Sequence, residues 1–277
     1  MAGVVLIPER TKITPALLER LPALRLISQT GRHGPHINMA ACTARGVAVA
    51  IGSGSPYAPA ELTWALVLAA MRGVARENAE LRAGRWQTML GRTVRGKTLG
   101  VLGYGNIGKL VSGYGRAFGM KVATFGREGT RSRAAADGVE CTSTRRELCE
   151  RSDVLSVHLR LTLETRGMIG REDLAAMPAE SLFVNTSRAE LVEPGALTAA
   201  LDAGRPGMAA VDMFESEPTL DHPLIHHPRV LATPHLGYVE RDGYELYLGT
   251  AFDNVLAFAR GEAVTLANPE VAAPRAP

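Results

Sequence analysis

Short apolar runs alternate with longer amphipathic stretches along most of this chain of 277 residues. In the second part of the chain, the apolar runs cover residues 99–102, 121–125, 154–158, 182–185, 208–212 and 230–232. Such runs are typical of strands buried on both faces, and the stretches between them have helical spacing. The alternation therefore predicts an α/β fold with a doubly wound, parallel Rossmann sheet.

The beginning of the chain repeats this alternation on a smaller scale. Two short helical stretches, which begin at Thr14-Pro15 and near Asn38, separate three apolar runs at residues 4–7, 24–28 and 47–51. Threonine before proline is a typical helix start, because the hydroxyl caps free N–H groups and proline suits the first turn. We expect a second, smaller sheet here.

A break and a long helical pattern follow. Gly-Ser-Gly-Ser-Pro at residues 52–56 ends the smaller pattern, and residues 59–82 predict one long helix that is apolar on much of its surface. Such a helix beside a glycine-rich break suits a connector between domains. The sequence therefore predicts a main Rossmann domain that begins with this helix and a smaller domain before the break.

Three glycines follow the run at residues 99–102. Gly103, Gly105 and Gly108 fit the spacing G-x-G-x-x-G, and the residues between them are Tyr104, Asn106 and Ile107. Gly103 permits a tight turn, Gly105 lets the backbone approach a pyrophosphate, and Gly108 lets the next helix pack closely. Spaced glycines alone also fit a structural turn, but their place between strand and helix favours a dinucleotide site.

Composition excludes several other classes. The formal net charge is +3, and no run of Lys or Arg suggests nucleic-acid binding. The opening apolar run ends at Pro8, and residues 62–71 are too few to span a bilayer, so we expect no membrane segment. Three scattered cysteines without C-x-x-C spacing suggest reduced thiols and a cytoplasmic location: Cys42, Cys141 and Cys149.

Three polar residues follow predicted strands of the main domain: Arg188, Glu217 and His235. An arginine can hold a carboxylate and a carbonyl with paired donors, and a histidine can donate a proton to that carbonyl oxygen. A carboxylate can orient the histidine. The trio therefore suits reduction of a 2-oxo acid. A second group, His222, His226 and His227, lies in a proline-broken loop without acidic ligand spacing, so we expect no metal site.

The chain resembles the D-isomer-specific 2-hydroxyacid dehydrogenases. Besides the glycine loop, the resemblance covers Val184-Asn185-Thr186-Ser187-Arg188, the run Val211 to Pro218, Asp221 to Leu224, and Thr233-Pro234-His235-Leu236-Gly237. It implies that Arg188 binds the substrate, that His235 is the acid/base and that Glu217 is its partner. It also implies a homodimer, a dinucleotide-binding Rossmann domain over residues 59–239, and a smaller, flavodoxin-like substrate domain over residues 1–58 and 240–277.

The resemblance further implies which residues surround the ligands. The cofactor contacts are His158, Leu159, Thr186, Ser187 and Asp212, with His235 at the nicotinamide end. The segment Thr30, Gly31 and Arg32 is implied to bind the substrate carboxylate. Three features depart from the family pattern: Arg160 replaces a proline, Ala189 replaces a glycine, and the usual opening strand and helix of the substrate domain are absent.

Cofactor choice depends on the end of the run at residues 121–125. NAD sites normally carry an acidic residue there, which binds the ribose hydroxyls. Here the position holds Gly126, followed by Arg127, whose guanidinium could bind a 2′-phosphate. This favours NADP(H), with NAD(H) possible; in the alternative, Glu128 serves NAD(H) at a solvated basic turn.

These observations together predict an NAD(P)-dependent oxidoreductase. The expected reaction transfers a hydride between nicotinamide and C2 of a small 2-oxo acid or D-2-hydroxy acid. The alternative is a dinucleotide-binding sensor, similar to a corepressor, with little turnover. The retained Arg188, Glu217 and His235 favour the enzyme.

Overall fold

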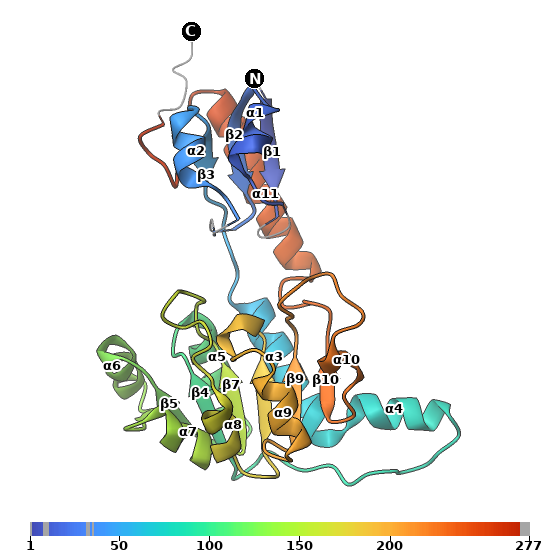
Figure 1. The fold of residues 1–277 in the computed structure, drawn as a ribbon. Coiled ribbons are helices and arrows are strands. Elements are labelled where there is room, and N and C mark those ends of the chain that lie inside the picture. Colours follow the sequence, from blue (N-terminus) through green and yellow to red (C-terminus); the bar gives the residue numbers. More distant parts are fainter. Residues whose placement is uncertain (1, 8–10, 32–33, 35, 272–277) are drawn as a thin grey trace. The chain divides into compact units, whose positions relative to one another are not determined.

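The computed structural model describes residues 2–7, 11–31, 34 and 36–271. The chain forms two compact units (Figure 1), one of Met1–Ser55 with Val239–Pro277 and the other of Pro56–Tyr238. Each unit has its own parallel sheet with flanking helices. This architecture confirms the predicted α/β, Rossmann-like fold.

The first unit has a three-stranded sheet in the order β1-β2-β3. Its elements are β1 (Ala2–Leu6), α1 (Pro15–Glu19), β2 (Leu24–Gln29), α2 (Met39–Ala44), β3 (Ala48–Ala50) and α11 (Arg241–Ala259). Neighbouring residues of β2 serve opposite faces of the sheet. Leu26 packs with Phe258 of α11, whereas Ile27 packs with Leu18 of α1 and Cys42 of α2.

The second unit has a seven-stranded sheet in the order β10-β9-β8-β7-β4-β5-β6, with every pairing parallel. The strands are β4 (Thr98–Leu102), β5 (Lys121–Phe125), β6 (Glu140–Cys141), β7 (Val154–Val157), β8 (Leu182–Asn185), β9 (Met208–Val211) and β10 (Val230–Ala232). The order reverses direction between β4 and β7. In open parallel sheets, ligands bind beyond the strand ends at such a switch point.

Helices cover both faces of this sheet. The helices of this unit are α3 (Tyr57–Arg72), α4 (Val74–Arg82), α5 (Asn106–Ala117), α6 (Glu128–Ala136), α7 (Arg145–Arg151), α8 (Arg171–Ala176), α9 (Ala196–Asp202) and α10 (Pro223–His226), with the short 3₁₀ helix η1 (Ala189–Leu191). All of them except α4 lie against the sheet or its edge. One core packs Leu99 and Val154 with α3 and α5, and the other packs Leu155 and Phe183 with α7, α8 and α9. Burial on both faces explains the uninterrupted apolar runs in the sequence.

The prediction of one helix over residues 59–82 was wrong, because the chain forms two helices that meet at Gly73. Gly73 has a φ of +64°, and its N–H donates to the Ala70 carbonyl at 3.1 Å. A Cβ at this position would collide with the side chain of Met89. The left-handed residue ends α3 and starts α4 in a new direction. Helix α3 buries one face, whereas α4 buries no residue.

Candidate active site

The segments after three neighbouring strands carry Arg188, Glu217 and His235. Arg188 follows β8, Glu217 follows β9 and His235 follows β10. The Nδ1 atom of His235 lies 2.5 Å from Oε2 of Glu217, and the two side chains are 21% and 23% exposed. The other carboxylate oxygen of Glu217 accepts the backbone N–H of Phe214 at 3.0 Å. The carboxylate therefore fixes one ring nitrogen of His235 and leaves the other available to a ligand.

The loop that carries His235 is held by Asp212, a fully buried residue. Its Oδ1 accepts the Thr233 hydroxyl at 2.6 Å and the Leu236 N–H at 2.7 Å, and its Oδ2 accepts the Gly237 N–H at 2.9 Å. Burial raises the pKa of Asp212 above its ordinary value, although the hydrogen bonds from Thr233, Leu236 and Gly237 act against this. His235 has a φ of +54°, which a non-glycine residue adopts only when its surroundings enforce it.

Arg188 stands on a backbone that is fixed by Asn185, a buried residue that was not among the predicted site residues. The Asn185 amide donates to the Arg188 carbonyl at 2.8 Å, and its oxygen accepts the Ser187 N–H at 3.0 Å. The Ser187 hydroxyl donates to the Val157 carbonyl on the adjacent strand at 2.7 Å. These bonds give the segment after β8 one conformation.

Thr186 is fixed from the opposite side by α3. The Thr63 hydroxyl donates to the Pro59 carbonyl at 2.6 Å, so in its 2.7 Å bond with Thr186 it acts as the acceptor. The hydroxyl proton of Thr186 is therefore committed to Thr63. The backbone of Thr186 is the part that can face a cofactor.

The glycine loop has the geometry that a dinucleotide requires. Gly103 has a φ of +103°, and a Cβ there would lie 2.5 Å from the His158 carbonyl oxygen. A Cβ on Gly108 would collide with the Gly103 carbonyl, whereas a Cβ on Gly105 would meet nothing within 4 Å. Helix α5 begins at Asn106 without a side-chain cap, so no capping side chain occupies the first N–H groups of the helix. The residues present fit a pyrophosphate.

Tyr104 anchors this loop to the unit. Its side chain is 2% exposed, and its hydroxyl donates to Asp137 Oδ2 at 3.1 Å. Burial and the nearby carboxylate raise its pKa to about 12, so the hydroxyl stays protonated. Lys109 pairs with the same carboxylate at 2.9 Å. Tyr104 therefore offers a ligand only its backbone.

His158, at the end of β7, is neutral. Its Nε2 lies 2.8 Å from the Ser156 hydroxyl, and its Nδ1 is buried without a hydrogen-bond partner among the described residues. Burial lowers its pKa to about 3. The next residue, Leu159, packs against the core of the second unit, whereas Arg160 is exposed.

The segment after β5 contains Gly126 and Arg127. A Cβ on Gly126 would lie 2.5 Å from the methyl group of Thr130, so a larger residue would require that side chain to move. Arg127 precedes α6, and its Nη2 lies 2.6 Å from Oε2 of Glu164 in the segment after β7. Two further arginines donate hydrogen bonds to backbone carbonyls. Arg131 donates to the Gly126 carbonyl and Arg133 to the Tyr104 carbonyl.

The predicted substrate segment belongs to the first unit. The Thr30 hydroxyl donates to the Leu6 carbonyl at 3.2 Å, and the Gly31 carbonyl accepts the Gly52 N–H at 3.0 Å. Both residues follow β2. Arg32 lies outside the described residues.

The three clustered histidines have separate partners. His222 donates to Glu215 at 3.0 Å, His226 bonds the Leu220 carbonyl at 3.0 Å, and His227 lies 3.4 Å from Asp202. Within the described part of the chain, no group of three or more potential ligands is placed to hold a metal. No described helix is long and apolar enough to cross a membrane.

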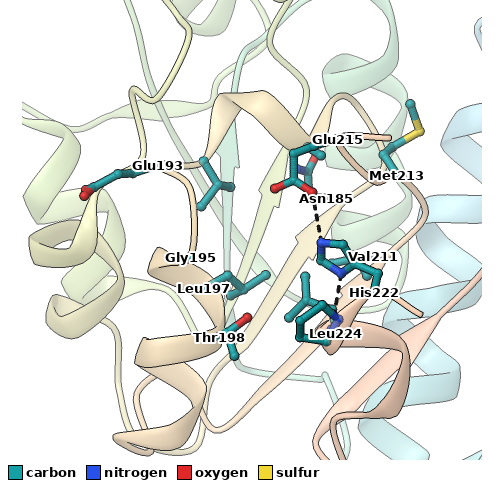
Figure 2. Close-up of a pocket in the computed structure, with 13 residues that line it drawn as sticks. Asn185, Glu193, Gly195, Leu197, Thr198, Val211, Met213, Glu215, His222 and Leu224 are labelled. Carbon is teal, nitrogen blue, oxygen red and sulfur yellow. Dashed lines mark hydrogen bonds and ion pairs between the residues drawn. The ribbon is translucent and has the colours of Figure 1, made fainter. Parts of the chain in front are cut away.

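His222 and Glu215 also line a cavity of about 220 Å³ (Figure 2). Figure 2 shows the pair near Asn185 and above the apolar side chains of Leu197 and Leu224. The lining includes none of Arg188, Glu217 and His235. The cavity is therefore separate from these three residues.

Known proteins share this sequence and fold. Residues 64–237 match the family model described as D-isomer specific 2-hydroxyacid dehydrogenase, NAD binding domain. A glyoxylate reductase from Aeropyrum pernix is 38% identical over 94% of this chain and 81% of its own length. A solved oxidoreductase structure from Ralstonia solanacearum is 52% identical, with a TM-score of 0.94, over 98% of this chain and 84% of that one.

A D-3-phosphoglycerate dehydrogenase from Methanocaldococcus jannaschii is 34% identical over 94% of this chain. The chain spans 50% of that relative's length. The similarity to all three proteins extends over both units of the chain described here.

Proposed function

Because the chain belongs to the D-isomer specific 2-hydroxyacid dehydrogenase family, we propose that it reduces a small 2-oxo acid to the D-2-hydroxy acid, and catalyses the reverse reaction, with His235 as the acid/base. The observation that carries this proposal is the His235–Glu217 pair, which is fixed by Asp212 beside the segment of Arg188. The cofactor of the family is a nicotinamide dinucleotide.

A bound nicotinamide nucleotide would supply the hydride that C2 receives in the reduction, and would itself be oxidised. Arg188 holds the substrate carboxylate and carbonyl through paired N–H donors. His235 gives its Nε2 proton to the carbonyl oxygen as the hydride reaches C2, so the C=O group becomes CH–OH. Glu217 accepts the Nδ1–H throughout and balances the positive charge of the ring before the transfer.

The remaining ligand contacts belong to the same proposal. The backbone of the glycine loop and the N-terminus of α5 would hold the pyrophosphate, and Thr186, Ser187 and Asp212 would surround the nicotinamide. Thr30, Gly31 and Arg32 would bind the substrate carboxylate. Residues 59–239 would thus be the dinucleotide domain, and residues 1–58 with 240–277 the substrate domain.

We propose that NADP(H) binds better than NAD(H). Gly126 supplies no carboxylate that would repel a 2′-phosphate. The side chain of Arg127 is 79% exposed, so it can contact a ligand that binds from solvent. In the alternative, Glu128 binds the ribose of NAD(H); its carboxylate accepts the Ser132 hydroxyl at 3.3 Å.

We also propose a homodimer. Helix α4 and the segment after it project from the sheet of the second unit (Figure 1). They expose four large apolar side chains: Val74, Leu81, Trp86 and Leu90. A second copy of this chain would cover them. A cytoplasmic location is the last part of the proposal, supported by free cysteines, of which Cys42 and Cys149 are buried.

The test is oxidation of NADPH and NADH with glyoxylate, hydroxypyruvate and other 2-oxo acids. We expect steady turnover with at least one acid and its loss in His235→Ala. Tight nucleotide binding without turnover on any acid would instead support the sensor.

A further inference from the structure

The ion pair between Arg127 and Glu164 joins two segments that follow the neighbours of strand β4. Arg127 follows β5 and Glu164 follows β7, and these two strands flank β4 in the sheet (Figure 1). The glycine loop follows β4. The 2.6 Å pair therefore joins the segments on either side of the strand that presents the phosphate site.

Glu164 is presented by an ordered turn. The Thr165 hydroxyl donates to the Arg160 carbonyl at 2.7 Å and accepts the Thr162 N–H at 2.8 Å. The Arg166 N–H donates to the Thr162 carbonyl at 3.0 Å. The side chain of Glu164 is 68% exposed, so the turn holds its backbone while its carboxylate can change partners.

Other carboxylates are less suited to a ribose at this end of the sheet. Gly126 has no carboxylate, and a side chain at this position would have to displace Thr130. Glu128 lies in the first turn of α6, where the Ser132 hydroxyl lies 3.1 Å from its backbone carbonyl and 3.3 Å from its carboxylate, and no arginine is paired with it among the described residues. Glu164 already lies against the arginine that is proposed to bind a 2′-phosphate.

We propose that Glu164 is a specificity-determining residue, whose carboxylate accepts the ribose hydroxyls of NAD(H) and competes with the 2′-phosphate of NADP(H) for Arg127. This inference rests on the proposed function, because it requires a bound nicotinamide dinucleotide. To reach Arg127, the 2′-phosphate dianion must displace the Glu164 carboxylate. It must also come close to the negative charge of that carboxylate. A ribose hydroxyl can donate to Glu164 and needs neither change.

The energetics allow both nucleotides to bind. An exposed ion pair contributes little to stability, so Arg127 can leave Glu164 at small cost. Hydrogen bonds from a ligand to a charged acceptor are stronger than those to a neutral acceptor. The balance between the two nucleotides therefore depends on the charge of Glu164.

The experiment compares Glu164→Gln with the wild-type protein. Kd for NADH and NADPH is measured by fluorescence titration, and Kd for 5′-AMP and adenosine 2′,5′-bisphosphate by calorimetry. We expect NADPH to bind about fivefold more tightly and NADH about fivefold more weakly. Adenosine 2′,5′-bisphosphate should bind more tightly, as NADPH does, and 5′-AMP should bind more weakly, as NADH does. In Arg127→Ala/Glu164→Gln, the gain for NADPH should disappear.

Glu150→Gln is the matched control, because Glu150 is an exposed carboxylate paired with Arg146 at 2.8 Å on α7. It should change neither Kd. An unchanged ratio of the NADH and NADPH constants in Glu164→Gln would overturn the inference, as would equal losses for both. A wild-type protein that binds neither nucleotide would overturn the proposed function itself.

Discussion

His235 Nδ1 and Glu217 Oε2 lie 2.5 Å apart, although 18 positions separate the two residues in the sequence. The contact joins the segment after β9 to the segment after β10, which are neighbours in the sheet. It leaves Nε2 as the ring nitrogen that can reach a ligand. The predictions below begin with this pair.

Glu217→Gln should lower kcat by about 100-fold, because the amide keeps the shape but cannot balance the charge of the protonated ring. The nucleotide Kd should stay unchanged. Glu215→Gln is the control, since Glu215 belongs to the same loop but contacts His222. Stopped-flow and steady-state kinetics with NADPH would measure both variants, and equal rates in the two would remove Glu217 from the mechanism.

Arg127→Ala should weaken the binding of NADPH about tenfold and leave the binding of NADH unchanged, because only NADPH carries the 2′-phosphate. Arg146→Ala, which removes another exposed arginine of the same unit, should leave both constants unchanged. Fluorescence titration gives the constants directly. If Arg127→Ala weakens both nucleotides equally, Arg127 does not bind the phosphate.

Gly105→Ala should bind NADPH and NADH at least about tenfold more weakly. Its free energy of unfolding should change by less than about 1 kcal/mol, because the new methyl group enters open space. The control is Gly113→Ala on α5, where a Cβ also meets nothing within 4 Å. Calorimetric binding and urea unfolding separate the two effects, and normal binding by Gly105→Ala would argue against a phosphate at this loop.

Stability should fall in acid because of His158. Burial lowers its pKa in the folded protein to about 3 from its ordinary value of 6.5, so only the unfolded chain takes up the proton between these values. The free energy of unfolding should therefore decrease as the pH falls below about 6.5. Between pH 7 and pH 5, the wild type should lose up to about 2 kcal/mol more than His158→Asn. Urea unfolding at both pH values tests this, and parallel losses would contradict it.

The exposed residues Trp86 and Leu90 should control assembly. We expect the wild-type protein to be a dimer at micromolar concentration and Trp86→Ser/Leu90→Ser to be a monomer, as measured by light scattering after size-exclusion chromatography. Leu220→Ser removes a side chain that is 83% exposed elsewhere in the unit, and it should remain a dimer. A monomeric wild type would contradict the proposed interface.

The strands of the main sheet could be predicted because burial on both faces leaves an apolar run. Strand β6 has no such run, since it is a two-residue edge strand whose residues, Glu140 and Cys141, are not buried. The turn at Gly73 was also missed, because only the later residue Met89 makes the close contact.

The order of residues after each strand was enough to select Arg188, Glu217 and His235. Their supports could not be predicted, because the hydrogen bonds from Thr186 to Thr63 and from Leu236 to Asp212 join residues far apart in the sequence. The roles of the three residues stay predictions until kinetics are measured.

The loop after β9 carries two glutamates, Glu215 and Glu217, which contact different histidines, His222 and His235. Asp212, at the start of the same loop, holds the segment of His235. Insertion or deletion of a single residue between Asp212 and Glu217 would move a carboxylate away from its ring. This loop should therefore accept changes of side chain at its exposed positions, but not changes of length.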